Sequence, residues 1–176
     1  DTLTMKAPEF KKKWSPLLKI KKVSSLDISH LAKKYIQERR IPASVHYKLY
    51  YASRFNEWVN SIIPDKLPKL EKDSPRLVMP FIDKNGNLFG FNARAFSSNE
   101  LRYITIMIDD SMPKIFGLDT VNFDDKYYVI EGPIDSLFID NSVAMAGADG
   151  KASGLESTEN AAVSYTHLRA HETSYD

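Results

Sequence analysis

The fold is decided by one short stretch, Tyr127-Tyr128-Val129-Ile130-Glu131-Gly132-Pro133-Ile134-Asp135-Ser136. Its first four residues are apolar or aromatic and have the length of a buried strand. Gly132 breaks that strand, and Pro133 is a favoured first residue of a helix, so we expect a short helix over residues 134–139. Asp135 suits the start of that helix. The stretch therefore predicts a strand that ends in an acid, Glu131, and passes directly into a helix.

A second apolar stretch, residues 142–146, follows this helix and is expected to be the next strand. A strand–helix–strand unit implies parallel pairing and a right-handed crossover. Glu131 would then lie at the carboxyl end of a strand, which is where open α/β sheets bind ligands. A carboxylate there can hold Mg²⁺ or act as an acid or base. The alternative is that Glu131 and Asp135 only cap the helix N-terminus.

An antiparallel hairpin is predicted upstream. Residues 76–82 form an apolar run of strand length, and residues 88–96 form the return strand. Asn85-Gly86 lies between them, and both positions tolerate the positive φ of a tight hairpin turn. Residues 103–108, which are apolar and β-branched, are expected to form a further strand.

The N-terminal part is expected to be mainly helical. Apolar residues at helical spacing predict a helix that ends near Arg40, because Pro42 disfavours helical geometry at the residue before it. Further helices are expected over residues 42–51 and 55–63, and a shorter one over residues 9–14. The whole chain is thus predicted to be α+β or α/β, with a helical N-terminal part, an antiparallel hairpin region and an incomplete strand–helix–strand unit.

Composition excludes several classes of protein. Hydrophobic residues make up 43% and charged residues 27% of the 176 residues, which is typical of a globular chain. The sequence contains no secretory signal and no apolar run near the roughly 18 residues that cross a bilayer. Because cysteine is absent, disulfides, thiol nucleophiles and zinc ribbons are excluded within these residues.

Charge is distributed unevenly along the chain. Residues 1–40 hold eleven lysines and arginines against four acids, a net charge of +7, although the whole chain carries only +1. A basic arm beside an acidic body suggests contact with a polyanion together with a carboxylate-bearing site. The alternative is a solvated basic face.

The C-terminal residues need separate treatment. Residues 163–173, Val-Ser-Tyr-Thr-His-Leu-Arg-Ala-His-Glu-Thr, resemble one reading frame of a transposase sequencing adapter. We therefore expect residues 151–176 to be a non-native or disordered tail, and the natural chain to have been cut near Ala162. The spacing of His167 and His171 would suit a metal on a helix, but these residues fall in the adapter-like string.

The acid-ended stretch resembles the first motif of the Toprim fold, which DNA primases, topoisomerases and some nucleases share. Upstream residues resemble primases specifically: the strand and hairpin of Arg76–Phe91, the arginine of Ala93-Arg94, the basic–aromatic pair Arg102-Tyr103, and the lysine-bearing segment Met112–Leu118. The family has a glycine where this sequence has Ala93. Residues Glu131–Phe138 are most similar to the primases of tailed bacteriophages.

The resemblance implies synthesis of short RNA primers on a single-stranded DNA template by Mg²⁺-dependent nucleotidyl transfer. Glu131 would bind metal or act as acid or base, with Asp135 as a possible second metal ligand. Arg94, Arg102 and Lys114 would contact phosphate or template, and Tyr103 would stack on a base. Each residue has a structural alternative. The stem of Arg94 could cover apolar strand surface, and Arg102 could be an exposed charge. Lys114 could be a turn residue, and Tyr103 could be a core residue.

The resemblance also implies a domain organisation and partners. Residues 1–70 would be a basic, mainly helical segment, residues 71–125 the basic N-terminal subdomain of a primase core, and residues 126–150 the start of the Toprim domain. Expected partners are single-stranded DNA, ribonucleoside triphosphates and a replicative helicase in the cytoplasm, with no membrane. Zinc is expected only in an upstream ribbon. A second acidic motif should fall beyond Ala162, so we expect the isolated chain to be inactive.

Two alternatives remain open from the sequence. The chain could belong to another Toprim protein, a nuclease or a topoisomerase, although those families need not carry the upstream hairpin and arginine segments. It could also be a non-catalytic nucleic-acid-binding module that uses its basic arm.

Overall fold

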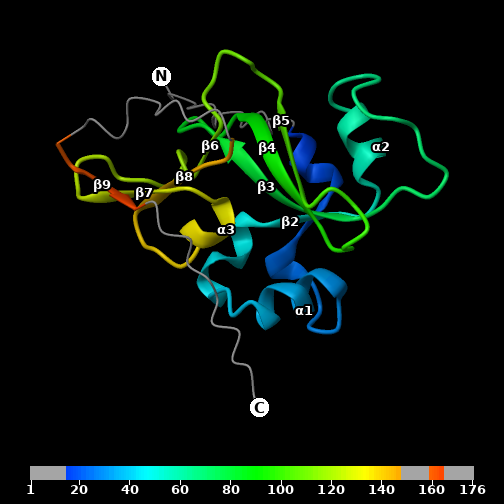
Figure 1. The fold of residues 1–176 in the computed structure, drawn as a ribbon, viewed down its shortest axis with the longest axis horizontal. Helices are drawn as coiled ribbons and strands as arrows, with labels where there is room; N and C mark the ends of the chain where they lie inside the picture. The colour runs from blue at the N-terminus through cyan, green and yellow to red at the C-terminus, as the bar shows by residue number, and fades with distance from the viewer. Residues whose placement is uncertain (1–14, 148–158, 165–176) are drawn as a thin grey trace, which may run out of the picture.

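Two β-sheets with a common core form the part of the chain that the structure, a computed structural model, describes: residues 15–147 and 159–164 (Figure 1). The first sheet is antiparallel, with the strand order β1 (Lys21–Lys22), β2 (Tyr50–Ala52), β3 (Arg76–Ile82), β4 (Leu88–Ala95) and β5 (Tyr103–Met107). The second sheet has the order β6 (Ile115–Phe116), β8 (Ser142–Met145), β7 (Tyr127–Ile130) and β9 (Ala161–Ser164).

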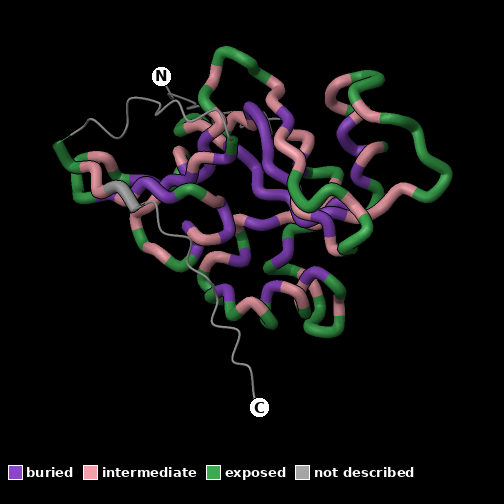
Figure 2. The backbone as a smooth tube through the Cα atoms, in the orientation of Figure 1, coloured by how far each residue is buried: buried purple, intermediate pink, exposed green. Residues whose placement is uncertain are grey.

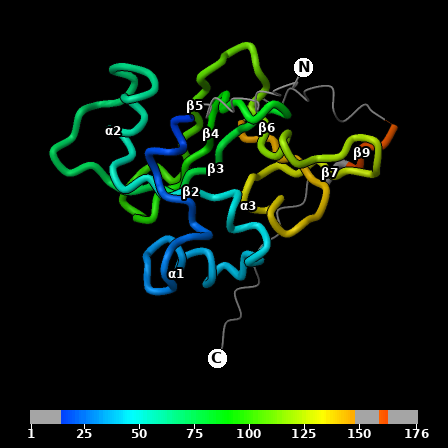
Figure 3. Tube along the Cα trace, turned by 180° about the vertical axis from the view of Figure 1, so that it is seen from behind, coloured from blue at the N-terminus to red at the C-terminus, as the bar shows by residue number. Residues whose placement is uncertain are grey.

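Helices are short in the described residues. They are α1 (Leu31–Glu38), α2 (Phe55–Asn60) and α3 (Pro133–Ser136), with 3-10 helices η1 (Pro16–Lys19), η2 (Val23–Ser25) and η3 (Ala43–Lys48). The two views from opposite sides place α2 at one end of the molecule and the second sheet at the other, with β3 and β4 between them (Figures 1 and 3).

The β3–β4 hairpin forms at the predicted turn. The Asp83 carboxylate accepts hydrogen bonds from the backbone N–H groups of Asn85 and Asn87, at 2.9 and 2.8 Å. Gly86 has φ +80°, a conformation that side chains with a Cβ rarely adopt. The Asn85-Gly86 pair therefore makes the tight turn that the sequence predicts.

Alternation along the strands gives the first sheet two buried faces. On one face, Val78, Phe91 and Ala93 pack against α2. On the other face, the side chains of β3 pack against the second sheet, α1 and α3 in a core that includes Leu77, Met79, Phe81, Ile36, Ile134, Leu137 and Ala144. Most residues of β3 and β4 are buried, and exposed residues lie mainly in the connecting loops (Figure 2).

The strand–helix–strand unit is present as predicted. Strands β7 and β8 are parallel, with Tyr128 opposite Ser142 and Ile130 opposite Ala144, and α3 connects them. The helix is shorter than residues 134–139, because it ends at Ser136 and continues only as turns. An antiparallel strand, β6, pairs with the outer side of β8 and was not predicted.

The N-terminal part is less helical than predicted. Residues 42–51 form η3 and then β2, where we expected one helix. The reason is tertiary: Tyr50 and Tyr51 pair with Val78 and Leu77 on the open side of β3, and this pairing overrides local preference. The helix expected over residues 9–14 lies outside the described residues.

Helix α1 begins at Leu31, with His30 as its cap, and ends at Glu38, close to the predicted end near Arg40. The Asp27 carboxylate, which could also cap a helix, accepts hydrogen bonds from the backbone N–H and the hydroxyl of Ser29. These bonds close a local turn before the helix begins.

Residues 159–164 are the described part of the expected non-native tail. Within them, β9 pairs in parallel with β7, so that Ala161 lies opposite Tyr127 and Ser164 opposite Ile130. The backbone groups on the free side of a strand readily pair with any extended segment. The non-native origin of the tail stays a prediction.

Across the two described ranges, no helix is long and apolar enough to cross a membrane.

The first sheet leaves no room for a side chain at Gly90. A Cβ atom there would lie 2.8 Å from Met107 Sδ and 2.9 Å from the Ile106 carbonyl oxygen. We expect Gly90→Ala to lower the free energy of unfolding by about 1–3 kcal/mol, measured by urea denaturation. Gly86→Asn is the matched control. No described atom lies within 4 Å of a Cβ built at Gly86, and asparagine tolerates positive φ. An unchanged stability of Gly90→Ala would show that the β4–β5 packing described here is wrong.

Candidate nucleic-acid and metal site

Arg94 and Tyr103 meet across neighbouring strands. The register of β4 and β5 places them directly opposite each other. Arg94 Nη1 donates a hydrogen bond to the Tyr103 hydroxyl at 2.8 Å, and the guanidinium carbon lies 5.3 Å from the centre of the Tyr103 ring. The register of the sheet thus brings together two residues that the sequence proposes for DNA binding.

Helix α1 adds two residues that the sequence analysis did not propose for the site. The Tyr35 ring lies 5.2 Å from the Arg94 guanidinium carbon and 5.0 Å from that of Arg39. In the sequence, Tyr35 lies within the helix that ends near Arg40, and Arg39 is one of the eleven basic residues of positions 1–40. Their spacing of four residues puts both on one helix face and is the signal that could have paired them.

These four residues, Tyr35, Arg39, Arg94 and Tyr103, are called the arginine–tyrosine cluster below. Within residues 15–147 and 159–164, neither arginine of the cluster forms an ion pair. Arg94 Nε is buried and has no hydrogen-bond partner in the structure. Burial raises the pKa of the Tyr35 hydroxyl, and the nearby arginines only partly oppose this rise. Two cations that stack on aromatic rings and have no anionic partner among the described residues suit a phosphate and a base.

A polar bridge joins this cluster to the second sheet. Asn92, two residues before Arg94 on the same face of β4, donates its amide hydrogen to the Thr105 hydroxyl at 3.0 Å. The Thr105 hydroxyl in turn donates to the carbonyl oxygen of Ala146 at 2.9 Å. Ala146 directly follows β8, so the bridge ends at the edge of the second sheet.

That edge carries Lys114 and Glu131. Lys114 precedes β6, and its carbonyl oxygen accepts a hydrogen bond from the Ala146 N–H at 2.9 Å. Its side chain runs along Gly147, where a Cβ atom would lie 2.8 Å from Lys114 Cδ. Glu131 follows β7, whose last residue is opposite Ala144 of β8. Because β8 alone separates β6 from β7, the backbones of Lys114 and Glu131 are about 10 Å apart.

The acidic residues at this edge fit Mg²⁺ in kind. Glu131 is exposed, so it does not lie inside apolar packing. The Asp135 carboxylate lies over Gly132, because a Cβ atom there would be 3.1 Å from Asp135 Oδ2. Mg²⁺ is commonly held by one or two carboxylates, with waters and substrate phosphates as its other ligands. No group of three or more acids, histidines or cysteines suited to a metal occurs in the part of the chain that the structure describes.

Arg102 is bound to β4 through its backbone. Its carbonyl oxygen accepts a hydrogen bond from the Ala95 N–H at 3.0 Å, and its side chain is exposed. In the described part of the chain, its guanidinium makes no hydrogen bond or ion pair with the cluster. The structure therefore brings Arg94 and Tyr103 into contact and leaves Arg102 beside them at the surface.

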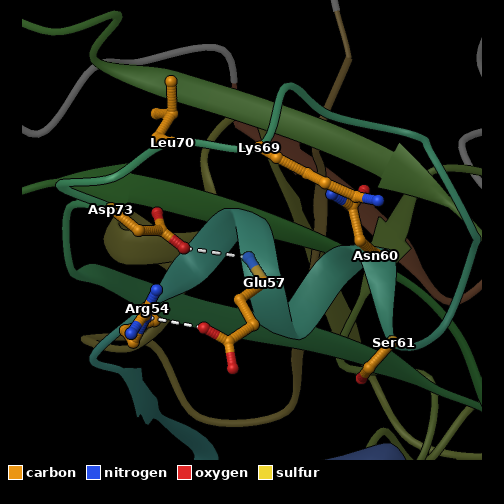
Figure 4. Close-up of a pocket in the computed structure, with 7 residues that line it drawn as sticks. All are labelled: Arg54, Glu57, Asn60, Ser61, Lys69, Leu70 and Asp73. Carbon is orange, nitrogen blue, oxygen red and sulfur yellow. Dashed lines mark hydrogen bonds and ion pairs between the residues drawn. The ribbon is translucent and has the colours of Figure 1, made fainter.

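A crevice of about 400 Å³ next to α2 lies on the other side of the first sheet (Figure 4). Its charged groups form ion pairs and hydrogen bonds with other residues in or beside the crevice. Arg54 pairs with Glu57 at 2.6 Å, and the Asp73 carboxylate accepts the N–H groups of Asn56 and Glu57 at the start of α2. We interpret this crevice as the place where residues 61–75, which connect α2 to β3, are attached to the helix.

Comparison with known proteins identifies the family. The chain is 38% identical over 127 residues, 72% of its length, to the DNA primase of Enterobacteria phage T4. The chain belongs to the DNA primase family. It spans 36% of the length of that primase, so it corresponds to about a third of it. No protein-family profile matches the chain.

Solved primase structures share the fold. A DnaG primase catalytic domain bound to single-stranded DNA has a TM-score of 0.56 and 20% identity, covering 75% of this primase chain and 51% of its own. The RNA polymerase domain of Mycobacterium tuberculosis DnaG, in complex with a double-stranded DNA oligomer with a 6-nucleotide overhang, has a TM-score of 0.57 and 18% identity, covering 80% and 55%. The two-sheet arrangement of the primase segment is therefore the fold of a primase core.

The buried hydroxyl of Tyr35 predicts a pH dependence of stability. Its pKa is raised above the ordinary value of 10.0, so above pH 10 the unfolded chain loses this proton more readily than the folded chain. The free energy of unfolding should therefore fall as the pH rises past about 10. Urea denaturation at pH 9 and pH 11 should show a smaller fall for Tyr35→Phe than for the wild type. The matched control, Tyr47→Phe, removes the hydroxyl of an exposed ring and should retain the wild-type fall; equal falls in all three proteins would contradict this assignment.

Proposed function

We propose that this chain is the template- and nucleotide-binding part of a DNA primase that makes short RNA primers on single-stranded DNA by metal-dependent nucleotidyl transfer. The observation that carries the proposal is the Asn92–Thr105–Ala146 bridge, which joins the arginine–tyrosine cluster to the sheet edge that carries Lys114 and Glu131. A primase must hold template and nucleotide next to each other, and the bridge connects a cationic, aromatic surface with a carboxylate.

The cluster is proposed to bind the template. Arg94 and Arg39 would hold backbone phosphates, because a guanidinium forms strong charge-assisted hydrogen bonds with phosphate oxygens. Tyr103 is 40% exposed, so its outer ring surface is available for a base. The DnaG domain solved with single-stranded DNA supports this proposal, because it has the same fold.

The sheet edge is proposed to bind the incoming ribonucleoside triphosphate. Lys114 would pair with its phosphates, and exposed Arg102 would add positive charge at the entrance. Glu131, with Asp135 beside it, would hold Mg²⁺. When bound, Mg²⁺ would neutralise charge on the attacking and leaving oxygens of an in-line transfer. The role of the chain is to orient the two polyanions and to place a carboxylate between them.

The remaining elements of the proposal follow from membership of the primase family. Primer synthesis belongs to DNA replication, so a replicative helicase is the expected partner and the cytoplasm of a bacterial cell the expected compartment. The inactivity of the isolated chain stays a prediction.

Removal of the Arg94 charge should weaken template binding. We expect Arg94→Gln to raise the Kd for a fluorescein-labelled oligo(dT) by about tenfold, measured by fluorescence anisotropy. The slope of log K against log salt should fall by about one, because one phosphate contact is lost. Arg54→Gln is the matched control, since Arg54 is paired with Glu57 on the other side of the sheet. Equal losses in both variants would indicate binding by net charge alone.

Removal of the Glu131 charge should weaken metal binding without affecting the template. We expect Glu131→Gln to reduce the affinity for Mg²⁺ by about tenfold or more in isothermal titration calorimetry, and to leave the oligo(dT) affinity unchanged. Asp110→Asn removes an exposed acid from a turn and should change neither quantity. The metal assignment is wrong if Mg²⁺ binds Glu131→Gln as tightly as the wild type.

A further inference from the structure

Arg76 is a buried cation that the proposed chemistry does not use. It is the first residue of β3, only 6% of it is exposed, and it faces α2, on the opposite side of the sheet from the arginine–tyrosine cluster. Its guanidinium carbon lies 5.4 Å from the centre of the Phe55 ring. Burial lowers the pKa of Arg76, and the nearby charge of Glu100 opposes this effect.

The guanidinium of Arg76 holds the backbone of the β4–β5 loop. Its Nη1 donates a hydrogen bond to the carbonyl oxygen of Leu101, 25 residues away, at 2.9 Å. Ala95, the partner of Arg76 on β4, donates its N–H to the carbonyl oxygen of Arg102 at 3.0 Å. The Arg76 guanidinium and the Ala95 N–H thus hold two consecutive carbonyls at the end of the loop, those of Leu101 and Arg102. The next residue along the chain is Tyr103.

The position of these two carbonyls matters because successive side chains of a strand point to opposite faces of the sheet. Tyr103 opens β5 and must point to the face that carries Arg94. A slip of one residue would turn Tyr103 to the α2 side. The preceding loop, residues 96–102, contains no strand or helix that would set this register.

Stability alone does not explain a cation at this position. Burying a guanidinium is costly, and apolar residues of similar volume often replace buried charges without loss of stability. Leu101 is 70% exposed, so the hydrogen bond from Arg76 ends on a surface loop and not in the apolar core. An apolar residue would therefore satisfy the core, but it would not hold the loop.

We propose that Arg76 is a positioning residue for the template site, which holds the backbone at Leu101 so that Tyr103 lies against Arg94. This inference rests on the proposed function of the Arg94–Tyr103 pair in binding single-stranded DNA.

The test compares Arg76→Met, which keeps the stem and removes the donors, with Arg76→Lys, which keeps one donor. Trp58→Phe is the matched control, because it also removes a hydrogen bond from a buried side chain to a backbone carbonyl on the same face of the sheet, that of Pro16 at 3.1 Å. Each protein is labelled with 3-fluorotyrosine, and the Tyr103 fluorine resonance is assigned from its loss in Tyr103→Phe. Oligo(dT) affinity and thermal stability are measured on the same samples.

We expect Arg76→Met to weaken oligo(dT) binding by about fivefold and to shift the Tyr103 resonance. Arg76→Lys should restore part of both, and Trp58→Phe should change neither. In a Tyr103→Ala background, Arg76→Met should weaken binding no further, because Arg76 acts through Tyr103. If Arg76→Met does not fold, the same two readouts in Arg76→Lys decide the question.

An unshifted Tyr103 resonance would overturn the proposal, as would the same fivefold loss in the Tyr103→Ala background. The failure of the proposed function would look different: wild type and Arg94→Gln would bind oligo(dT) equally. The resonance would in that case still report whether Arg76 positions Tyr103.

Discussion

The apolar contact between β3 and the second sheet is the constraint on which the rest of the structure depends. Leu77, Met79 and Phe81 point from one face of β3 into a core shared with α1, α3 and β8. Because Leu77 lies opposite Arg94 in the sheet, the same alternation that buries Leu77 places Arg94 on this face. The core that joins the two sheets therefore also directs the proposed template residues towards the proposed metal site.

Polar groups continue this face where the apolar core ends. Asn92 and Thr105 lie on the face that carries Met79, and their hydrogen bonds lead to the Ala146 carbonyl. A buried polar group is costly unless it is hydrogen-bonded, so this bridge has few alternative arrangements. It fixes the distance between the arginine–tyrosine cluster and the sheet edge, which is what a reaction between two bound polyanions requires.

The sequence was sufficient for features that depend on local pattern. The Asn85-Gly86 turn, the β3 and β4 strands and the parallel β7–α3–β8 unit follow from apolar periodicity and turn chemistry. Features that depend on distant partners were missed: Tyr50 and Tyr51 form a strand only because β3 offers a free side, and β6 is two residues long. Arg94 and Tyr103 were proposed from the family resemblance, whereas Tyr35 and Arg39 joined them only through the docking of α1.

The central claim is that template and metal sites lie on one continuous face, and paramagnetic relaxation by Mn²⁺ tests it most directly. In an NMR spectrum of the chain with Mn²⁺ and a bound oligo(dT), the account predicts broadening of the amides of Gly132, Ala146 and Ile115, and of the oligonucleotide protons. The amides of α2, behind the first sheet, should stay sharp. Broadening centred on α2, or an oligonucleotide untouched by Mn²⁺ that broadens Gly132, would contradict the account.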